Sequence, residues 1–215
     1  MSVKILVLAD IHNQEITLSN ILQSLEKISD HLDYCVIAGD ITNFGTVQDL
    51  ENMLNLIVMQ IPKTFYVVGN CDPLISKNSL NSDAINVDAK VYEMEFFSII
   101  GFGTDKPILD KRKIKKLHRT NKQVCLLTHT PPFNTSADME SLNRHTGSKQ
   151  IRECIEKNNN IFLSISGHIH DSPTISKMNG CTIVNPGSVT TGNFAIIDVQ
   201  TNFKVKGQIY NLHEL

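Results

Sequence analysis

Five short apolar segments of this chain each end abruptly at a small polar or charged residue, and this pattern constrains the fold more than any other feature. The segments are 4–9, 34–38, 64–68, 124–127 and 161–166. Uninterrupted apolar runs of this length are typical of strands that are buried on both faces of a layered sheet. We therefore expect layered sheets whose strand ends carry most of the polar chemistry.

Two amphipathic segments separate the first three of these runs. Apolar residues recur at spacings of three and four in 13–29 and in 47–61, which predicts a helix in each. Thr46 and Asp49 have the spacing of a capping box at the start of the second helix. A further short helix is predicted over 148–157. Alternation of strand and helix implies parallel crossover connections.

The second half of the chain has a different pattern, in which short strands are joined by turns. The predicted strands are 91–101, 174–177, 182–184, 193–199 and 202–210. Glycine-containing pairs such as Asn179-Gly180 mark the turns between them. We expect mixed sheets with helices outside. Because no linker-like stretch separates the halves, residues 1–215 are interpreted as a single domain.

Composition argues against several classes of protein. The net charge is −2 and the isoelectric point is about 6.4, which argues against a general nucleic-acid or membrane-surface binder. No apolar run approaches the roughly 20 residues that a membrane span needs, and the N-terminus lacks a secretory pattern. The five cysteines are odd in number and lack C-x-x-C spacing, which predicts reduced thiols and a cytoplasmic location.

Oxygen and nitrogen donors follow the five apolar runs. These donors are Asp10, His12, Asp40, Asn70, His129, His168 and His170. Ligands gather beyond the carboxyl ends of strands in open α/β sheets, so the seven side chains are expected to meet in one cleft. They suit divalent transition ions, and the absence of cysteine among them argues against a structural zinc site. Gly39, Gly69 and Gly167 each precede a donor, and glycine permits a tight turn there.

The number of donors indicates two metal ions. Seven donors exceed what one ion needs beside its waters, whereas a shared Asp40 would give each of two ions about four protein ligands. Two ions roughly 3.5–4 Å apart can share a hydroxide and clamp an in-line displacement at phosphorus.

The ordered motifs resemble those of the calcineurin-like metallophosphoesterase superfamily. They are Asp10-Ile11-His12, Gly39-Asp40, Gly69-Asn70, Thr128-His129 and Gly167-His168-Ile169-His170, and the resemblance extends from Ile5 to about Ser188. Shorter features are similar to the small Icc-like predicted phosphoesterases of that superfamily. These features are Pro131-Pro132, His145-x-Gly147-Ser148 and Asn185-Pro186-Gly187.

The resemblance implies a fold and a role for each donor. The fold would be a four-layer αββα sandwich of two mixed β-sheets flanked by helices. Asp10, His12 and His170 would hold the first metal, Asn70, His129 and His168 would hold the second, and Asp40 would bridge them. Catalysis would depend on Asp40, Asn70 and His129. Manganese is the favoured ion, with iron, zinc, nickel and cobalt as alternatives.

One departure from the family pattern concerns catalysis. Many members carry histidine after the G-N pair, whereas this chain has Gly69-Asn70-Cys71-Asp72. A thiol with an ordinary pKa near 8.5 is uncharged at neutral pH, so it cannot replace an imidazolium as an acid. We expect slower turnover of esters with poor leaving groups. A second departure, Asn43 in place of an aspartate, does not affect a predicted metal ligand.

Four further residues are candidates for accessory roles, each with a structural alternative. Cys71 would be a catalytic thiol or, as the favoured interpretation, a packing cysteine. Asp72 would orient the site or cap a turn. Asn13 would contact phosphate or cap the following helix. His145 would reach the substrate, replace the missing acid, or lie in a surface loop with Ser148 as a helix cap.

A cluster of seven basic residues within 111–122 is interpreted as a solvated helix face, with an anionic partner as the alternative. Substrate specificity is expected from the segments 104–109 and 131–147.

The favoured function is a two-metal phosphodiesterase acting on a small phosphoester. The alternatives are a nucleotide phosphomonoesterase or pyrophosphatase, and a non-catalytic metal-binding scaffold on the same fold. A homodimer is compatible with the later antiparallel strands, although nothing in the pattern requires one.

Overall fold

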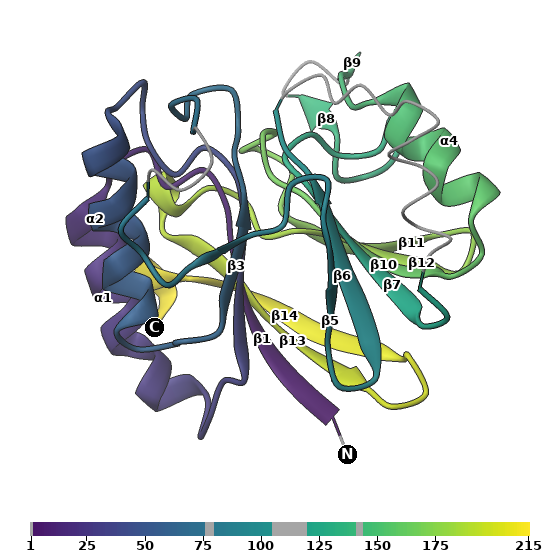
Figure 1. The fold of residues 1–215 in the computed structure, drawn as a ribbon, viewed down its shortest axis with the longest axis horizontal. Helices are drawn as coiled ribbons and strands as arrows, with labels where there is room; N and C mark the ends of the chain where they lie inside the picture. Colours follow the sequence, from purple (N-terminus) through teal and green to yellow (C-terminus); the bar gives the residue numbers. More distant parts are fainter. Residues whose placement is uncertain (1, 76–79, 105–119, 141–143) are drawn as a thin grey trace.

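The computed structural model describes residues 2–75, 80–104, 120–140 and 144–215. Two six-stranded sheets pack face to face, with helices α1 (Glu15–Ile28) and α2 (Val47–Val58) on one outer side and α4 (Lys149–Lys157) on the other (Figure 1). The four-layer αββα architecture with two mixed sheets is therefore confirmed. No described helix is long and apolar enough to cross a membrane.

The first sheet has the strand order β14-β13-β1-β2-β3-β4. Its strands are β1 (Ser2–Leu8), β2 (Tyr34–Ala38), β3 (Thr64–Val67), β4 (Ile85–Asn86), β13 (Asn193–Gln200) and β14 (Val205–Asn211). Strands β1 to β4 run parallel, and α1 and α2 form the crossovers from β1 to β2 and from β2 to β3. Strand β13 runs antiparallel to both of its neighbours.

The second sheet has the strand order β11-β12-β10-β7-β6-β5. Its strands are β5 (Val91–Glu93), β6 (Phe97–Phe102), β7 (Gln123–Thr128), β10 (Ile161–Ile165), β11 (Thr174–Met178) and β12 (Cys181–Asn185). The four inner strands are parallel and the two edge strands antiparallel. The prediction of one strand over 91–101 was wrong, because the backbone amide of Met94 bonds to the carbonyl of Phe97 and closes a hairpin.

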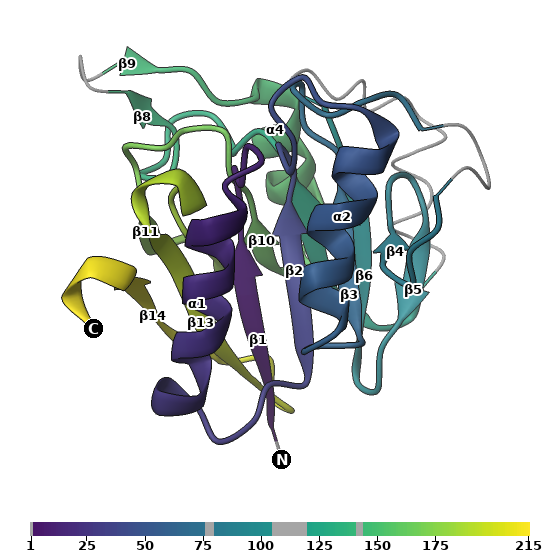
Figure 2. The same ribbon diagram turned by 90° about the vertical axis from the view of Figure 1, so that its left-hand side faces the viewer.

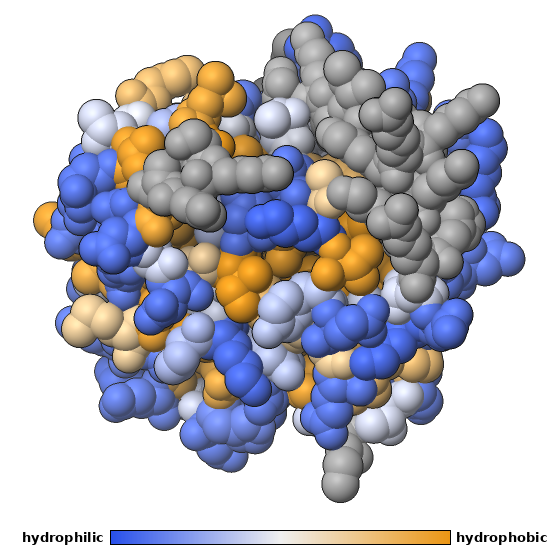
Figure 3. Space-filling model, viewed as in Figure 1, coloured by the Kyte–Doolittle hydropathy of each residue, from blue (hydrophilic) through white to orange (hydrophobic). Residues whose placement is uncertain are grey.

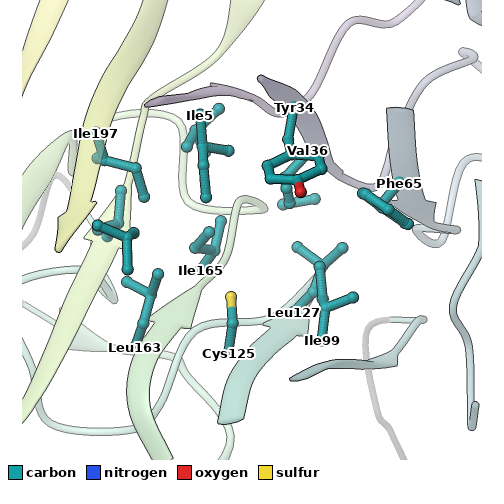
Figure 4. Packing of buried hydrophobic residues seen from close by; sticks show 14 of the residues in the cluster. Ile5, Tyr34, Val36, Phe65, Ile99, Cys125, Leu127, Leu163, Ile165 and Ile197 are labelled. Carbon is teal, nitrogen blue, oxygen red and sulfur yellow. The ribbon is translucent and has the colours of Figure 1, made fainter. Parts of the chain in front are cut away.

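Apolar side chains from both sheets meet in the middle layer. Ile5, Val36 and Phe65 of the first sheet face Cys125 and Leu127 of the second (Figure 4). The alternate residues of β1, Leu6 and Leu8, instead pack beneath the helices. Burial on both faces explains why these strands read as continuous apolar runs. All five cysteines are buried and free.

Side chains cap the N-termini of two of the three described α-helices. The Thr46 side chain accepts the amide of Asp49 and the Asp49 carboxylate accepts the amide of Thr46, which confirms the capping box. Ser148 caps α4 by accepting the amide of Ile151. Helix α1 instead begins after Gln14 without a side-chain cap, so the alternative that Asn13 caps it was wrong.

Both sheets place the carboxyl ends of their parallel strands at the same end of the sandwich (Figures 1 and 2). The hairpin of β8 (Met139–Glu140) and β9 (Arg144–His145) lies at this end too. Hydrophilic and hydrophobic residues are mixed over the face seen in Figure 3. Most of the basic cluster predicted over 111–122, and most of the specificity segment 104–109, lie outside the described residues.

Candidate metal centre

Backbone hydrogen bonds join the loop after β1 to the loop after β2, and the loop after β10 to the loop after β7. The amides of Asp10 and His12 donate to the carbonyls of Gly39 and Asp40, both at 3.0 Å, and the amide of Gly167 donates to the carbonyl of His129 at 2.9 Å. These bonds bring residues from distant parts of the chain to one end of the sandwich. The predicted donors therefore emerge from a common, rigid frame.

Four of the predicted donors have a left-handed backbone. Asp10, His12, Asp40 and His168 have φ of 53°, 47°, 50° and 69°. Such values are uncommon for residues other than glycine and cost free energy, and they concentrate at functional sites. Four strained donors at adjoining strand ends indicate that the strain serves to aim their side chains.

The three glycines that precede donors are required either by the backbone conformation or by lack of space for a Cβ atom. Gly39 has a φ of +86°, which fits the predicted turn. Gly69 is required by space instead, because a Cβ there would lie 2.1 Å from Oδ1 of Asp40. At Gly167 a Cβ would lie 2.6 Å from that of Ala9. The turn argument was therefore wrong for Gly69 and Gly167, whose role is to let the loops approach closely.

One group of donors consists of Asp10, His12 and His170. Nε2 of His170 lies 3.5 Å from Oδ1 of Asp10 and 3.4 Å from Nε2 of His12. One ligand atom from each residue lies within 4.8 Å of the others. This is the set that the sequence predicted for the first metal.

A second group consists of Asp40, His129 and His168, which also offer ligand atoms within 4.8 Å of one another. Nδ1 of His168 lies 3.0 Å from Nε2 of His129. Oδ1 of Asn70 lies 3.0 Å from the same Nε2 and extends the group. Together with Asp40, these are the residues predicted for the second metal.

Asp40 lies between the two groups. Its Oδ2 is 3.8 Å from Nε2 of His12 and 3.4 Å from Nε2 of His129. Its other oxygen accepts the backbone amide of Cys71 at 2.8 Å. One carboxylate oxygen therefore faces both groups, while the other is fixed by the protein.

The donor set fits a cation. Nδ1 of His129 lies 2.8 Å from the carbonyl of Ala38, which can only accept, so Nδ1 carries the hydrogen and Nε2 presents a lone pair. Asn70 Oδ1 and Asp40 Oδ2 face the same nitrogen. Once Nε2 of His129 gives up its own proton, three acceptor atoms converge there and form a natural place for a metal ion.

The electrostatics of the site also favour positive charge. Burial by itself lowers the pKa of His129, but the hydrogen bond to Asp40 and the charges of Asp10 and Asp40 raise it to about 9. Burial raises the pKa of Asp40, yet the hydrogen bond and charge of His129 and the amide of Cys71 lower it to about 2. A bound cation would replace the proton that His129 otherwise holds.

Asp72 supports the site without facing it. Its Oδ1 accepts the amide of Thr42 at 2.7 Å and its Oδ2 accepts the amide of Gly69 at 2.8 Å. Burial raises the pKa of this carboxyl group, while these amide bonds lower it. Asp72 thus joins the loops that carry Asp40 and Asn70, which agrees with the orienting role considered for it.

Cys71 lies closer to the donors than a packing role requires. The residue is 8% exposed, and Sγ falls within 4.8 Å of ligand atoms of His12 and Asp40. Nδ2 of Asn70 donates to Sγ at 3.3 Å, which turns Oδ1 of Asn70 toward His129. Burial and the nearby Asp40 raise the pKa of the thiol to about 12. Cys71 directly follows Asn70 in the sequence, which could have indicated the contact between the two side chains. That contact was not predicted from the sequence.

The two remaining accessory candidates, Asn13 and His145, each bond to a residue outside the two donor groups. The amide of Asn13 bonds to the carbonyl of Ile41 at 3.2 Å, and its side chain is exposed beside the loop of His12. His145 lies in β9, where its Nδ1 is 2.8 Å from Oδ1 of Asp138. Asp138 was not among the residues predicted from the sequence.

Comparison with known proteins identifies the family. The model of the calcineurin-like phosphoesterases matches residues 3–172, and the chain belongs to this family. An uncharacterised protein of Methanocaldococcus jannaschii, MJ1162, is 31% identical over 219 residues, which cover 94% of each chain. The family is metal-dependent and acts on phosphoesters.

Solved structures share the fold at low sequence identity. TT1561 of Thermus thermophilus superposes with a TM-score of 0.73 and 15% identity, covering 99% of this chain and all of that one. A structure described as a novel archaeal phosphodiesterase has a TM-score of 0.52 and 15% identity, covering 96% and 99%. Both structures therefore share the fold of this chain over nearly its whole length.

Proposed function

We propose that this chain is a phosphodiesterase that uses two divalent cations. The observation that carries the proposal is Oδ2 of Asp40, which faces both His12 of one donor group and His129 of the other. When bound, two such cations neutralise charge on the phosphate oxygens and activate the attacking water for an in-line displacement. Manganese is the favoured ion.

Each donor has a defined task in this proposal. Asp10, His12 and His170 hold the first cation, Asn70, His129 and His168 hold the second, and Asp40 is shared. The hydrogen bond from His129 to Ala38 keeps Nε2 available as a ligand. The thiol of Cys71 holds the amide of Asn70 so that its oxygen faces the second position.

Charge supports a diester in preference to a monoester. A diester carries one negative charge at neutral pH and a monoester about two, so the monoester needs more positive charge around it. On the described part of the β8–β9 hairpin, Arg144 is paired with Glu140 at 2.8 Å, so its charge is not left over for a dianion. The archaeal phosphodiesterase among the structural neighbours is consistent with this choice.

Hydrolysis of bis(p-nitrophenyl) phosphate with added Mn²⁺ tests the proposal. We expect turnover by the wild type and a loss of several orders of magnitude in Asp40→Ala and His129→Ala. His31→Ala, at an exposed histidine paired with Asp33, serves as the matched control. Equal rates in all four proteins would refute a metal-centred reaction, and faster hydrolysis of p-nitrophenyl phosphate would point to a monoesterase.

A non-catalytic scaffold is the alternative that Cys71 favours, because a thiol replaces a better acid there. The assembly of all seven donors argues against it, since a scaffold has no need of the full set. A stoichiometric protein partner together with no Mn²⁺-dependent turnover would support the scaffold. Dimerisation through the edge strands β11 or β14 stays a prediction for light scattering to test.

A further inference from the structure

Departure of an alkoxide at neutral pH requires a proton donor, and the donor groups themselves do not supply one. In the proposed phosphodiesterase, the lone pairs of the imidazole and amide donors are directed at the cations. Asp72 is half-buried and accepts backbone amides on both oxygens. The thiol of Cys71 is buried against Asn70. Among the described side chains, those at the rim of the site are therefore the candidates for a proton donor.

His145 and Asp138 form a paired imidazole and carboxylate at that rim. Nδ1 of His145 lies 2.8 Å from Oδ1 of Asp138, and Asp138 is fully buried. Backbone amides fix the carboxylate further: those of Asn134 and Gly147 donate to Oδ2 at 2.9 and 3.0 Å, and that of Thr135 donates to Oδ1 at 2.8 Å.

This pairing determines which ring nitrogen is free for chemistry. A carboxylate accepts a hydrogen from Nδ1, so Nε2 is the nitrogen left to exchange protons with another molecule. The same carboxylate orients the ring, as in other catalytic histidine–carboxylate pairs. The side chain of His145 is 27% exposed, so part of it is open to molecules in solution.

The loop that carries this pair is fastened to the loop of the predicted ligands His168 and His170. Nδ2 of Asn185 donates to the carbonyl of Ala137 at 3.2 Å and to that of Ile169 at 2.9 Å. Ala137 precedes Asp138, and Ile169 lies between the two histidines. The hydroxyl of Ser172 also donates to the carbonyl of Met139. Both loops lie at the same end of the sandwich (Figures 1 and 2).

The surroundings of His145 restrain its ring. The edge of Phe133 packs against the imidazole with centroids 5.9 Å apart, and Lys149 Nζ lies 5.2 Å from the centroid of Phe133. On the same hairpin, Glu140 is paired with Arg144 and lies within electrostatic range of His168. The hairpin therefore borders the second donor group, with its own charges already paired.

We propose that His145, oriented by Asp138, protonates the leaving group of the diester. As the bond between phosphorus and the leaving oxygen breaks, the N–H bond at Nε2 breaks and an O–H bond forms on that oxygen. The imidazole then regains a proton from solvent, which received one from the attacking water. This role deepens the proposed function and depends on it, and it extends the substrates to diesters of poorly acidic alcohols.

Esters that differ in their leaving group distinguish an acid role of His145 from a purely structural role in its loop. His145→Asn places an amide nitrogen where Nδ1 stood, so the bond to Asp138 is retained while the acid is lost. We expect rates with Mn²⁺ on methyl p-nitrophenyl phosphate within a few fold of the wild type. On methyl phenyl phosphate we expect a loss on the order of 10²-fold or more, the usual contribution of general acid catalysis. His145→Gln is the second variant, and His31→Asn is the matched control.

The outcomes are distinct. A selective loss on the phenyl ester, with an unchanged melting temperature, supports the proposal. Equal losses on both esters, or no loss on the phenyl ester, would overturn it and leave the pair as a structural brace. If the wild type hydrolysed neither ester, the proposed phosphodiesterase itself would fail, and this inference with it.

Discussion

In the metal-free protein, His129 should make stability fall as the pH rises. Because its pKa in the folded protein is about 9, against an ordinary value of about 6.5, the folded state binds this proton more tightly than the unfolded chain does. The stabilisation is fully present below about pH 6.5 and is lost as the pH rises through about 9. At about 1.36 kcal/mol per pKa unit, this histidine contributes about 3 kcal/mol.

Urea unfolding of chelator-treated protein at about pH 6 and about pH 9.5 measures the effect. We expect the free energy of unfolding of the wild type to fall by about 3 kcal/mol more than that of His129→Gln over this interval. His170, whose pKa is raised by Asp10, contributes in the same direction in both proteins and cancels in the difference. A saturating divalent cation should abolish the extra pH dependence, because it replaces the proton.

The same pH dependence in the wild type and in His129→Gln would refute the reasoning. It would mean that the charges of Asp10 and Asp40 do not hold a proton on this buried ring, and the attraction of the site for cations would lose its main electrostatic support. His31→Gln, which changes an exposed histidine, controls for the loss of any imidazole.

Three further predictions follow from close packing around the site. Gly69→Ala should weaken Mn²⁺ binding by at least tenfold in calorimetry, because its Cβ would meet Oδ1 of Asp40 at 2.1 Å, whereas Gly180→Ala, in open space, should cost only about 1 kcal/mol of stability and leave binding intact. Asp72→Asn should lower the free energy of unfolding by about 1–3 kcal/mol in urea titration, because an amide nitrogen would face one of two backbone donors. Leu127→Ala, in the layer between the sheets, should cost about 2–5 kcal/mol in the same assay without changing the metal affinity of the folded protein.

The layered sheets could be predicted from the sequence because the burial of each strand is visible in its own residues. Strands buried on both faces, such as β2 with all five residues buried, have to be continuously apolar. The hairpin between β5 and β6 was missed because 94–96 contains neither glycine nor proline. Its turn instead closes through the backbone of Met94 and Phe97.

The donors were predictable because each lies within a few residues of the end of an apolar strand, but the residues that support them were not. Asp72 bonds to Thr42 across 30 positions of the chain, and Gly69 is glycine because Asp40 approaches it from another loop. Asp138 has no strand end or motif to mark it, and its pairing with His145 depends on a loop whose path is set by several backbone amides. Such contacts depend on tertiary packing, which leaves no periodic signal.

Anomalous diffraction from a crystal soaked in Mn²⁺ tests the central claim most directly. We expect two peaks per chain roughly 3.5–4 Å apart, one among Asp10, His12 and His170, the other among Asn70, His129 and His168, with Asp40 contacting both. A single peak, no peak, or a carboxylate of Asp40 turned away from both positions would contradict the account.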